Sequence, residues 1–148
     1  MGLTYQPPLA GIGSRFLAML VDGLIGSLMM LPGLAIILYA IMANPNNPSI
    51  PALIFGVLLT FVLWLGLLAL MLVMWTRAQT PGKRLLGLRV IKLDTGQPAS
   101  FWRMVLREIV GKWVSGVICY LGFIWAFLDA NKQAWHDKIA GTIVVKEP

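Results

Sequence analysis

Two long apolar stretches constrain this chain more than any other feature. From Arg15 to Ala43 the only charged side chains are Arg15 and Asp22, and residues 51–75 carry no charge at all. At a rise of about 1.5 Å per residue, each stretch can cross the roughly 30 Å hydrocarbon core of a bilayer as a helix. Only 12% of the residues are charged, against about 25% in soluble domains, so the sequence predicts a membrane protein.

The first stretch is predicted to be a permanent helix rather than a cleavable signal peptide. Residues 1–14 contain none of the Lys or Arg that open a signal peptide. The apolar run is also longer than the roughly 7 to 15 residues of a signal core.

Charge is distributed unevenly around the two predicted spans. The segment 76–112 is basic, whereas the loop NPNNPSIP at 44–51 has no charge and many turn-forming residues. The positive-inside rule therefore places the basic segment and the N-terminus in the cytoplasm and the loop outside. The net charge of +6 then suits anionic lipid head groups, and nucleic acid as a partner would not explain the apolar bulk. The basic residues expected to face lipid are Lys83, Arg84, Arg103 and Lys112.

A third apolar segment, 109–128, leaves two alternatives open. Its uncharged part from Trp113 to Leu128 has 16 residues, or about 24 Å of helix, which is marginal for a span. The segment is therefore expected either to span or to re-enter the membrane, bending near Gly116 or Gly122. Before it, residues 101–112 predict an amphipathic helix on the inner membrane surface, with Arg103 and Arg107 on one face.

Two short runs rich in β-branched residues are predicted to pair as strands. The first is LRVIKL at 88–93. The second is GTIVVK at 141–146, which lies in the C-terminal segment 129–148. Pairing places the C-terminus in the cytoplasm beside the basic segment. The predicted fold is thus a single all-α membrane domain over residues 1–148, with three or four hydrophobic or amphipathic helical segments and a small cytoplasmic two-stranded β element.

Three motifs in order resemble the RDD family of small membrane proteins. They are GSRFLAMLVDGLIG at 13–26, TPGKRLLGLRV at 80–90 and AWHDKIAGTIVV at 134–145. The family is named for one arginine and two aspartates, which match Arg15, Asp22 and, better than Asp129, Asp137. The resemblance implies a bacterial-type cytoplasmic membrane and a role in transport, including cation/proton exchange. Some relatives serve instead as scaffolds or as modules fused to other domains.

Arg15 and Asp22 are the central candidate residues. Seven residues apart, they project from one helix face about 10.5 Å apart along the axis, which is near the limit of direct contact. Ionisable groups within a membrane are costly and commonly pair, so Asp137 or Arg107 is expected to complete an ion, proton or polar network. The structural alternatives are that Arg15 only anchors the helix at the interface and that Asp22 forms a pair with a purely structural role. Asp129 and Asp137 could equally belong to a solvated helix end and its cap.

No pattern in the sequence indicates catalysis. His136 is the only histidine and Cys119 the only cysteine, so we expect no metal site and no cofactor. The Gly-Lys pair at 82–83 lacks the spacing of a phosphate-binding loop, and no nucleophile stands with a base. We therefore expect not an enzyme but either a transporter of ions or small solutes, acting as a homo-oligomer, or a scaffold or accessory subunit that binds another membrane protein.

Overall fold

The computed structural model describes residues 8–111, 113–114 and 121–147, and the chain divides into two compact units. Residues 22–72 form one unit, which we call the hairpin unit. Residues 1–21 and 73–148 form the other, which we call the sheet unit.

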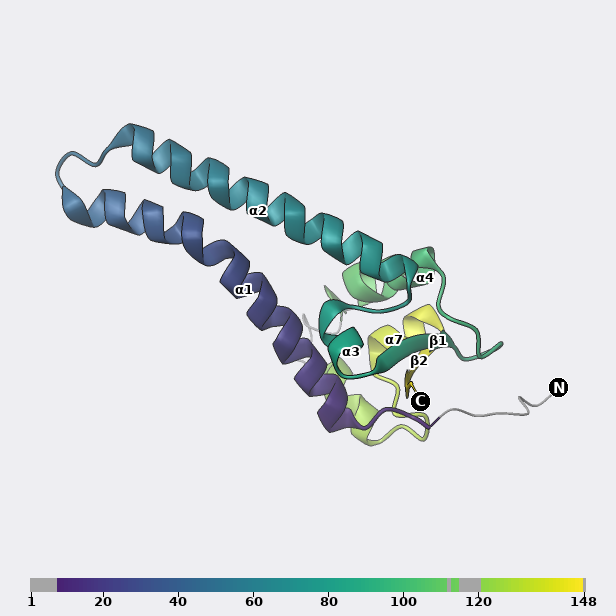
Figure 1. Cartoon of the computed structure of the whole chain (residues 1–148). Helices are drawn as coiled ribbons and strands as arrows, with labels where there is room; N and C mark the ends of the chain where they lie inside the picture. The colour runs from purple at the N-terminus through teal and green to yellow at the C-terminus, as the bar shows by residue number, and fades with distance from the viewer. Residues whose placement is uncertain (1–7, 112, 115–120, 148) are drawn as a thin grey trace. The chain divides into compact units, whose positions relative to one another are not determined.

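The hairpin unit is built from two long helices, α1 (Ile12–Ala43) and α2 (Ile50–Thr76) (Figure 1). The turn between them is closed by the Asn47 backbone N–H, which donates to the Asn44 carbonyl at 3.1 Å. The most apolar 18-residue windows have mean hydropathies of 2.2 and 2.7, yet only 11% and 6% of these windows is buried. Their apolar side chains thus face outward, unlike those of a soluble core helix. The two long helices predicted from the sequence are confirmed.

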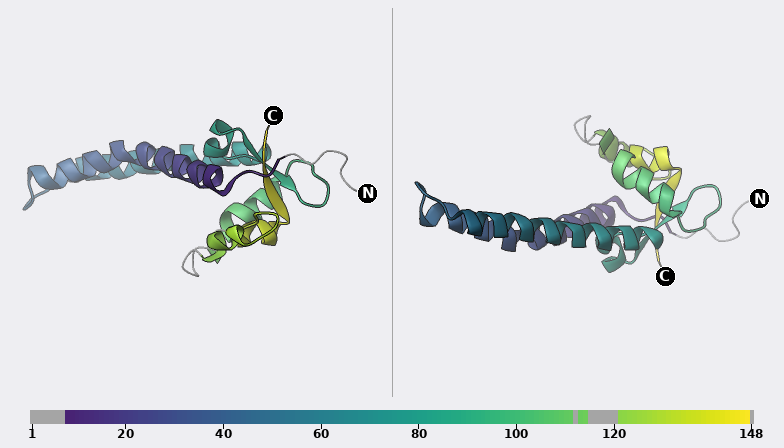
Figure 2. Two further views of the ribbon diagram at one scale, coloured as in Figure 1. Left: turned by 90° about the horizontal axis from the view of Figure 1, so that it is seen from below. Right: turned by 90° about the horizontal axis from the view of Figure 1, so that it is seen from above.

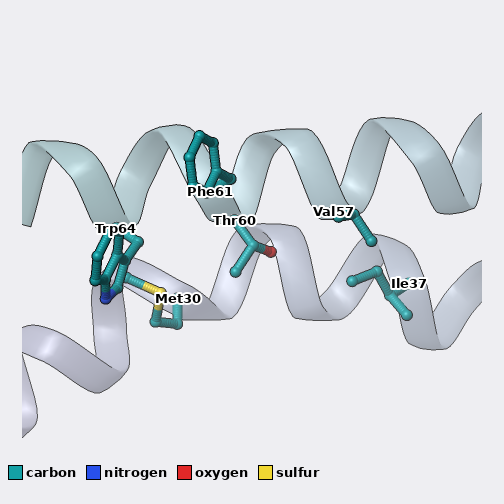
Figure 3. Close-up of a pocket in the computed structure, with 6 residues that line it drawn as sticks. All are labelled: Met30, Ile37, Val57, Thr60, Phe61 and Trp64. Carbon is teal, nitrogen blue, oxygen red and sulfur yellow. The ribbon is translucent and has the colours of Figure 1, made fainter.

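Glycines let the two helices approach closely within this unit. A Cβ atom on Gly33 would lie 2.8 Å from the Gly56 carbonyl oxygen, and one on Gly56 would lie 2.7 Å from the Ile37 side chain. Small residues at such a crossing are typical of membrane helix pairs. Beside it, an open apolar groove of about 310 Å³ runs between the helices (Figure 3). Its lining residues are Met30, Ile37, Val57, Thr60, Phe61 and Trp64.

The sheet unit contains the predicted strand pair. Strands β1 (Leu88–Lys92) and β2 (Thr142–Lys146) are antiparallel, with Leu88 opposite Lys146 and Lys92 opposite Thr142. β-Branched and aliphatic side chains suit this half-buried pleated surface. Isolated bridges extend the pair on both sides, from Leu9 to Val145 and from Ile91 to Pro98. The pairing predicted from the sequence is confirmed.

Short helices surround these strands. They are α3 (Pro81–Leu85), α4 (Phe101–Val105), the π-helical η1 (Leu106–Gly111), α6 (Leu121–Ile124), the 3₁₀-helical η2 (Trp125–Phe127) and α7 (Trp135–Ala140). The chain enters α3 through Thr80, whose hydroxyl accepts a hydrogen bond from the Lys83 backbone N–H at 3.3 Å. Gly141, in the left-handed region at φ 61°, ends α7 and leads into β2. η1 packs directly on α7, as the two views of Figure 2 allow the reader to follow.

The region of the predicted third membrane segment is described only over residues 109–111, 113–114 and 121–128. The predicted amphipathic helix is present over 101–111, but its second half is π-helical, a change that the sequence pattern did not indicate. Of the segment 109–128, residues 113 and 114 are helical and residues 121–127 form α6 and η2. The predicted bend at Gly116 lies outside the described residues, whereas Gly122 lies inside α6.

Candidate functional site: a buried cluster of charges

Asp137 is the centre of a buried group of charged side chains in the sheet unit. It lies in the first turn of α7 and its side chain is only 1% exposed. One carboxylate oxygen, Oδ1, accepts a hydrogen bond from Arg107 Nε at 2.6 Å. The other, Oδ2, accepts from Arg15 Nη1 and from the Ala134 backbone N–H, each at 3.2 Å. The carboxylate thus caps its own helix and binds two arginines distant in sequence.

Arg107 extends this group through a second carboxylate. Its Nη1 donates to Glu108 Oε1 at 2.7 Å, and the same oxygen accepts from Lys83 Nζ at 2.9 Å. Its Nη2 lies 3.4 Å from Nε2 of His136. We call the set of Arg15, Lys83, Arg107, Glu108, His136 and Asp137 the ionic cluster.

Arg15 joins the first turns of α1 to the C-terminal half of the chain. Besides Asp137, its guanidinium donates to the Lys132 carbonyl at 2.5 Å and to the Val144 carbonyl at 3.1 Å. Planar guanidinium groups with several fixed donors suit such multiple contacts better than an ammonium does. One side chain therefore connects α1 to the loop before α7, to α7 itself and to β2.

The contacts within the ionic cluster shift the pKa values of its central pair toward the charged forms. Burial alone would raise the pKa of Asp137, but the charges of Arg107, His136 and Arg15 and the hydrogen bond from Arg107 together lower it below its ordinary value. Burial alone would lower the pKa of Arg107, but Asp137 and Glu108 raise it. At neutral pH the central pair is therefore ionised.

The structure brings together three of the five predicted network residues, namely Arg15, Arg107 and Asp137. Asp22 belongs to the hairpin unit, where it is half-buried in α1. Asp129 is also outside the cluster. It forms an ion pair with Lys138 at 2.6 Å and accepts backbone N–H bonds from residues 131 and 133. The hydrogen bond from Lys138, helped by these backbone bonds, lowers the pKa of Asp129.

The basic residues expected to face lipid fall into different environments. Lys83 is a correction, because its ammonium is buried against Glu108 and is not presented to head groups. The carboxylate of Glu108, on the separate helix η1, makes this burial possible. Arg84 is exposed, as its predicted role requires. Arg103 is partly exposed and binds Asp94 at 3.3 Å and the Gly141 carbonyl at 3.2 Å. Lys112 lies outside the described residues.

Three cluster members were missed by the sequence reasoning: Lys83, Glu108 and His136. One signal could have indicated Glu108, because it is the only acidic residue between positions 95 and 128 in a basic stretch. Nothing local indicates that Lys83, 25 positions earlier, would reach it. Among the described residues, no group of three or more His, Cys, Asp and Glu side chains is arranged to hold a metal ion.

Several known proteins are similar to part of this chain. A proline-rich antigen homolog of Mycobacterium tuberculosis is 36% identical over 64 residues, covering 43% of this chain and 26% of that protein. An uncharacterized protein of Haemophilus influenzae is 38% identical over 77 residues, covering 50% of this chain and 49% of that protein. The chain thus spans about a quarter to a half of the length of these relatives.

A longer match is the membrane protein YteJ of Bacillus subtilis. It is 28% identical over 142 residues, which cover 93% of this chain and 81% of that protein. No solved structure matches the chain. The model of the RDD family matches residues 9–141, nearly the whole chain. With its two long apolar helices the chain is a membrane protein, and it belongs to the RDD family.

Proposed function

We propose that the protein moves cations or protons across a cytoplasmic-type membrane, with Asp22 as the group that takes up and releases the ion. One observation carries the proposal. Asp22 is the only charged residue between positions 22 and 72, and it lies in a helix long and apolar enough to span a bilayer. An ionisable side chain in such a segment is costly to keep, and in membrane proteins it commonly marks an ion or proton pathway.

The ionic cluster has a different role in this proposal. Arg15 stands seven residues before Asp22 on the same helix, and its guanidinium is held by Asp137 and by two backbone carbonyls. Such contacts fix the first turns of α1 with respect to α7 and β2. The cluster therefore serves as an anchor from which the apolar part of α1 enters the membrane.

Charge asymmetry supports a multi-pass arrangement with both termini in the cytoplasm. All 12 Lys and Arg residues lie outside residues 22–72, and the turn between the helices carries no charge. The positive-inside rule then places the sheet unit in the cytoplasm and the turn outside. Because two helices cannot enclose a pathway, we propose that several copies assemble around it.

A membrane scaffold or accessory subunit is the second candidate, and the exposure of the hairpin favours it. Only 11% and 6% of the apolar windows of α1 and α2 is buried, which leaves broad helix faces for another membrane protein. A scaffold would need the anchor formed by Arg15 and Asp137 but no exchange of ions at Asp22.

Flux measurements on the purified chain separate the two candidates. The protein is reconstituted in proteoliposomes, a cation gradient is imposed, and internal pH is followed with a trapped dye. Transport predicts pH-dependent flux in the wild type that Asp22→Asn abolishes while the thermal midpoint in detergent stays within a few degrees. Asp94→Asn, which alters an exposed carboxylate, is the matched control and should retain flux.

Other outcomes reject the transport proposal. Flux that survives in Asp22→Asn shows that this residue does not carry the ion. If Asp22→Asn and Arg15→Gln each lower the thermal midpoint, and the double variant is less than additive, Asp22 is part of a structural lock instead. Absence of flux in a folded wild-type protein favours the scaffold.

A further inference from the structure

The helical stretch 101–111 exposes an apolar face and buries Met104, Arg107 and Glu108 on the other. Met104 and Arg107 are 0% and 2% exposed, and Gly111 packs so closely on α7 that an added Cβ would lie 2.7 Å from the Cβ of His136. On the other side, Trp102 is 75% and Ile109 55% exposed. This is the reverse of an ordinary surface helix, which turns its apolar stripe toward the core.

The exposed residues follow helical spacing. They are Trp102, Leu106, Ile109 and Val110, at positions i, i+4, i+7 and i+8, which places them on one side of a helix. We call this set the outer face. The three charged residues of the stretch do not interrupt it, since Arg103 binds Asp94 and Gly141 while Arg107 and Glu108 belong to the ionic cluster. Trp113, just beyond η1, is also 73% exposed.

The contacts on the buried side keep this orientation. Arg107 is bound to Asp137 through Nε, and Gly111 leaves no room between η1 and α7 for the stretch to roll. Turning the outer face inward would break a buried ion pair, which is strongly unfavourable. The apolar side is therefore exposed as a consequence of the cluster and not through loose packing.

We propose that the outer face lies flat in the interfacial region of an anionic lipid leaflet, as an in-plane helix. Charge complementarity selects lipid as the occupant. The chain outside residues 22–72 carries 12 Lys and Arg against 5 Asp and Glu, a net charge of +7, and anionic leaflets attract such segments. Trp is the residue type enriched where hydrocarbon meets head groups, and Trp102 begins the face. An interfacial helix of this kind buries its apolar side about 5 to 10 Å into the boundary.

This placement concerns the membrane contact of the sheet unit and does not depend on ion transport. It also gives the segment after Val105 a different role from the two spans: η1 rests on the membrane surface. The basic side chains of an ordinary interfacial helix face water, whereas here Arg107 is bound to Asp137 of α7 and Arg103 to Asp94.

Depth-dependent quenching tests the proposal on the full chain. In a Cys119→Ser background, Leu106→Cys and Ile109→Cys are labelled with an environment-sensitive fluorophore in vesicles containing phosphatidylglycerol. Thr95→Cys, an exposed polar position in the turn after β1, is the matched control. We expect blue-shifted emission at 106 and 109, at least twofold stronger quenching by lipids with shallow than with deep spin labels, and protection from aqueous iodide. Position 95 should be quenched by iodide and by neither lipid.

Four results would overturn the proposal. Iodide quenching at 109 as strong as at 95 would mean that the face lies in water. Strongest quenching by the deep spin label would mean that the segment spans. A blue shift with no quenching by either lipid would mean that protein covers the face. Equal shallow quenching in vesicles of phosphatidylcholine alone would reject the requirement for anionic lipid, and the thermal midpoint of each labelled protein verifies its fold.

Discussion

Asp137→Asn should destabilise the protein far more than any substitution of an exposed carboxylate. The asparagine keeps one acceptor oxygen, but its NH₂ group must face donors, either Arg107 Nε or both Arg15 Nη1 and the Ala134 N–H. Arg107, which is buried, then loses its shortest ionic contact, at 2.6 Å. Removing one partner of such a buried pair costs about 3 to 5 kcal/mol, because the remaining charge stays buried.

The thermal midpoint of the full chain in detergent measures this loss. For a domain of about 150 residues, 1 kcal/mol corresponds to about 2 to 4 °C, so the midpoint should fall by about 6 to 20 °C. Asp94→Asn is the matched control, because the Asp94 side chain is 58% exposed and binds only the partly exposed Arg103 by an ion pair. Its midpoint should stay near that of the wild type.

Two results would refute the reasoning. If Asp137→Asn unfolds at the wild-type temperature, the ion pairs of the cluster contribute nothing measurable. If Asp94→Asn is equally harmful, the effect is one of overall charge and not of burial. A double-mutant cycle of Asp137→Asn with Arg107→Met then measures the pair itself, and a coupling below about 0.5 kcal/mol would show that the two side chains act independently.

Three further predictions follow from the same contacts. Because the pKa of Asp137 is lowered in the folded state, its carboxylate stabilises the fold above the ordinary carboxyl pKa of about 4. This stabilisation is lost as the pH falls through the lower folded pKa. The gap in thermal midpoint between wild type and Asp137→Asn should therefore narrow from pH 7 to pH 3. Gly111→Ala should cost about 1 to 3 kcal/mol in thermal unfolding, since its Cβ would overlap His136, whereas Gly13→Ala, in open space, should cost little. Gly33→Ala should increase the α1–α2 separation measured by spin-label distances on the turn-proximal halves of the helices, and an unchanged distance distribution would contradict the glycine contact at the helix crossing.

Sequence patterns predicted the elements whose formation depends on the residues within them. The two long helices follow from uninterrupted apolar stretches, and the strand pair from two short β-branched runs with no other partner. The π-helical form of η1 was not predicted, because it changes hydrogen bonding without changing composition. For 101–111 the periodicity showed two faces but not which one would be covered. That depends on α7, which lies some 25 residues further on.

The candidate site was predictable only where a residue type was unusual for its surroundings. Arg15 and Asp137 stood out, one at the start of an apolar helix and the other in a recognisable motif. Lys83 did not, since a lysine in a basic segment resembles its lipid-facing neighbours. Its burial depends on Glu108, and contacts between residues 25 positions apart are decided by tertiary packing rather than by sequence spacing.

Asp22 and Asp137 lie in different environments, and this difference indicates which of the two to test for transport. Asp137 accepts hydrogen bonds from two arginines and a backbone N–H, so its charge is fixed at neutral pH and a proton taken up there would break the anchor of α1. Asp22 lies in an apolar helix, where no other charged residue follows for the next 50 positions. Carboxylates in contrasting environments commonly divide such roles. Asp137→Asn should therefore lower stability first and flux only as a consequence, whereas Asp22→Asn should remove flux from a folded protein.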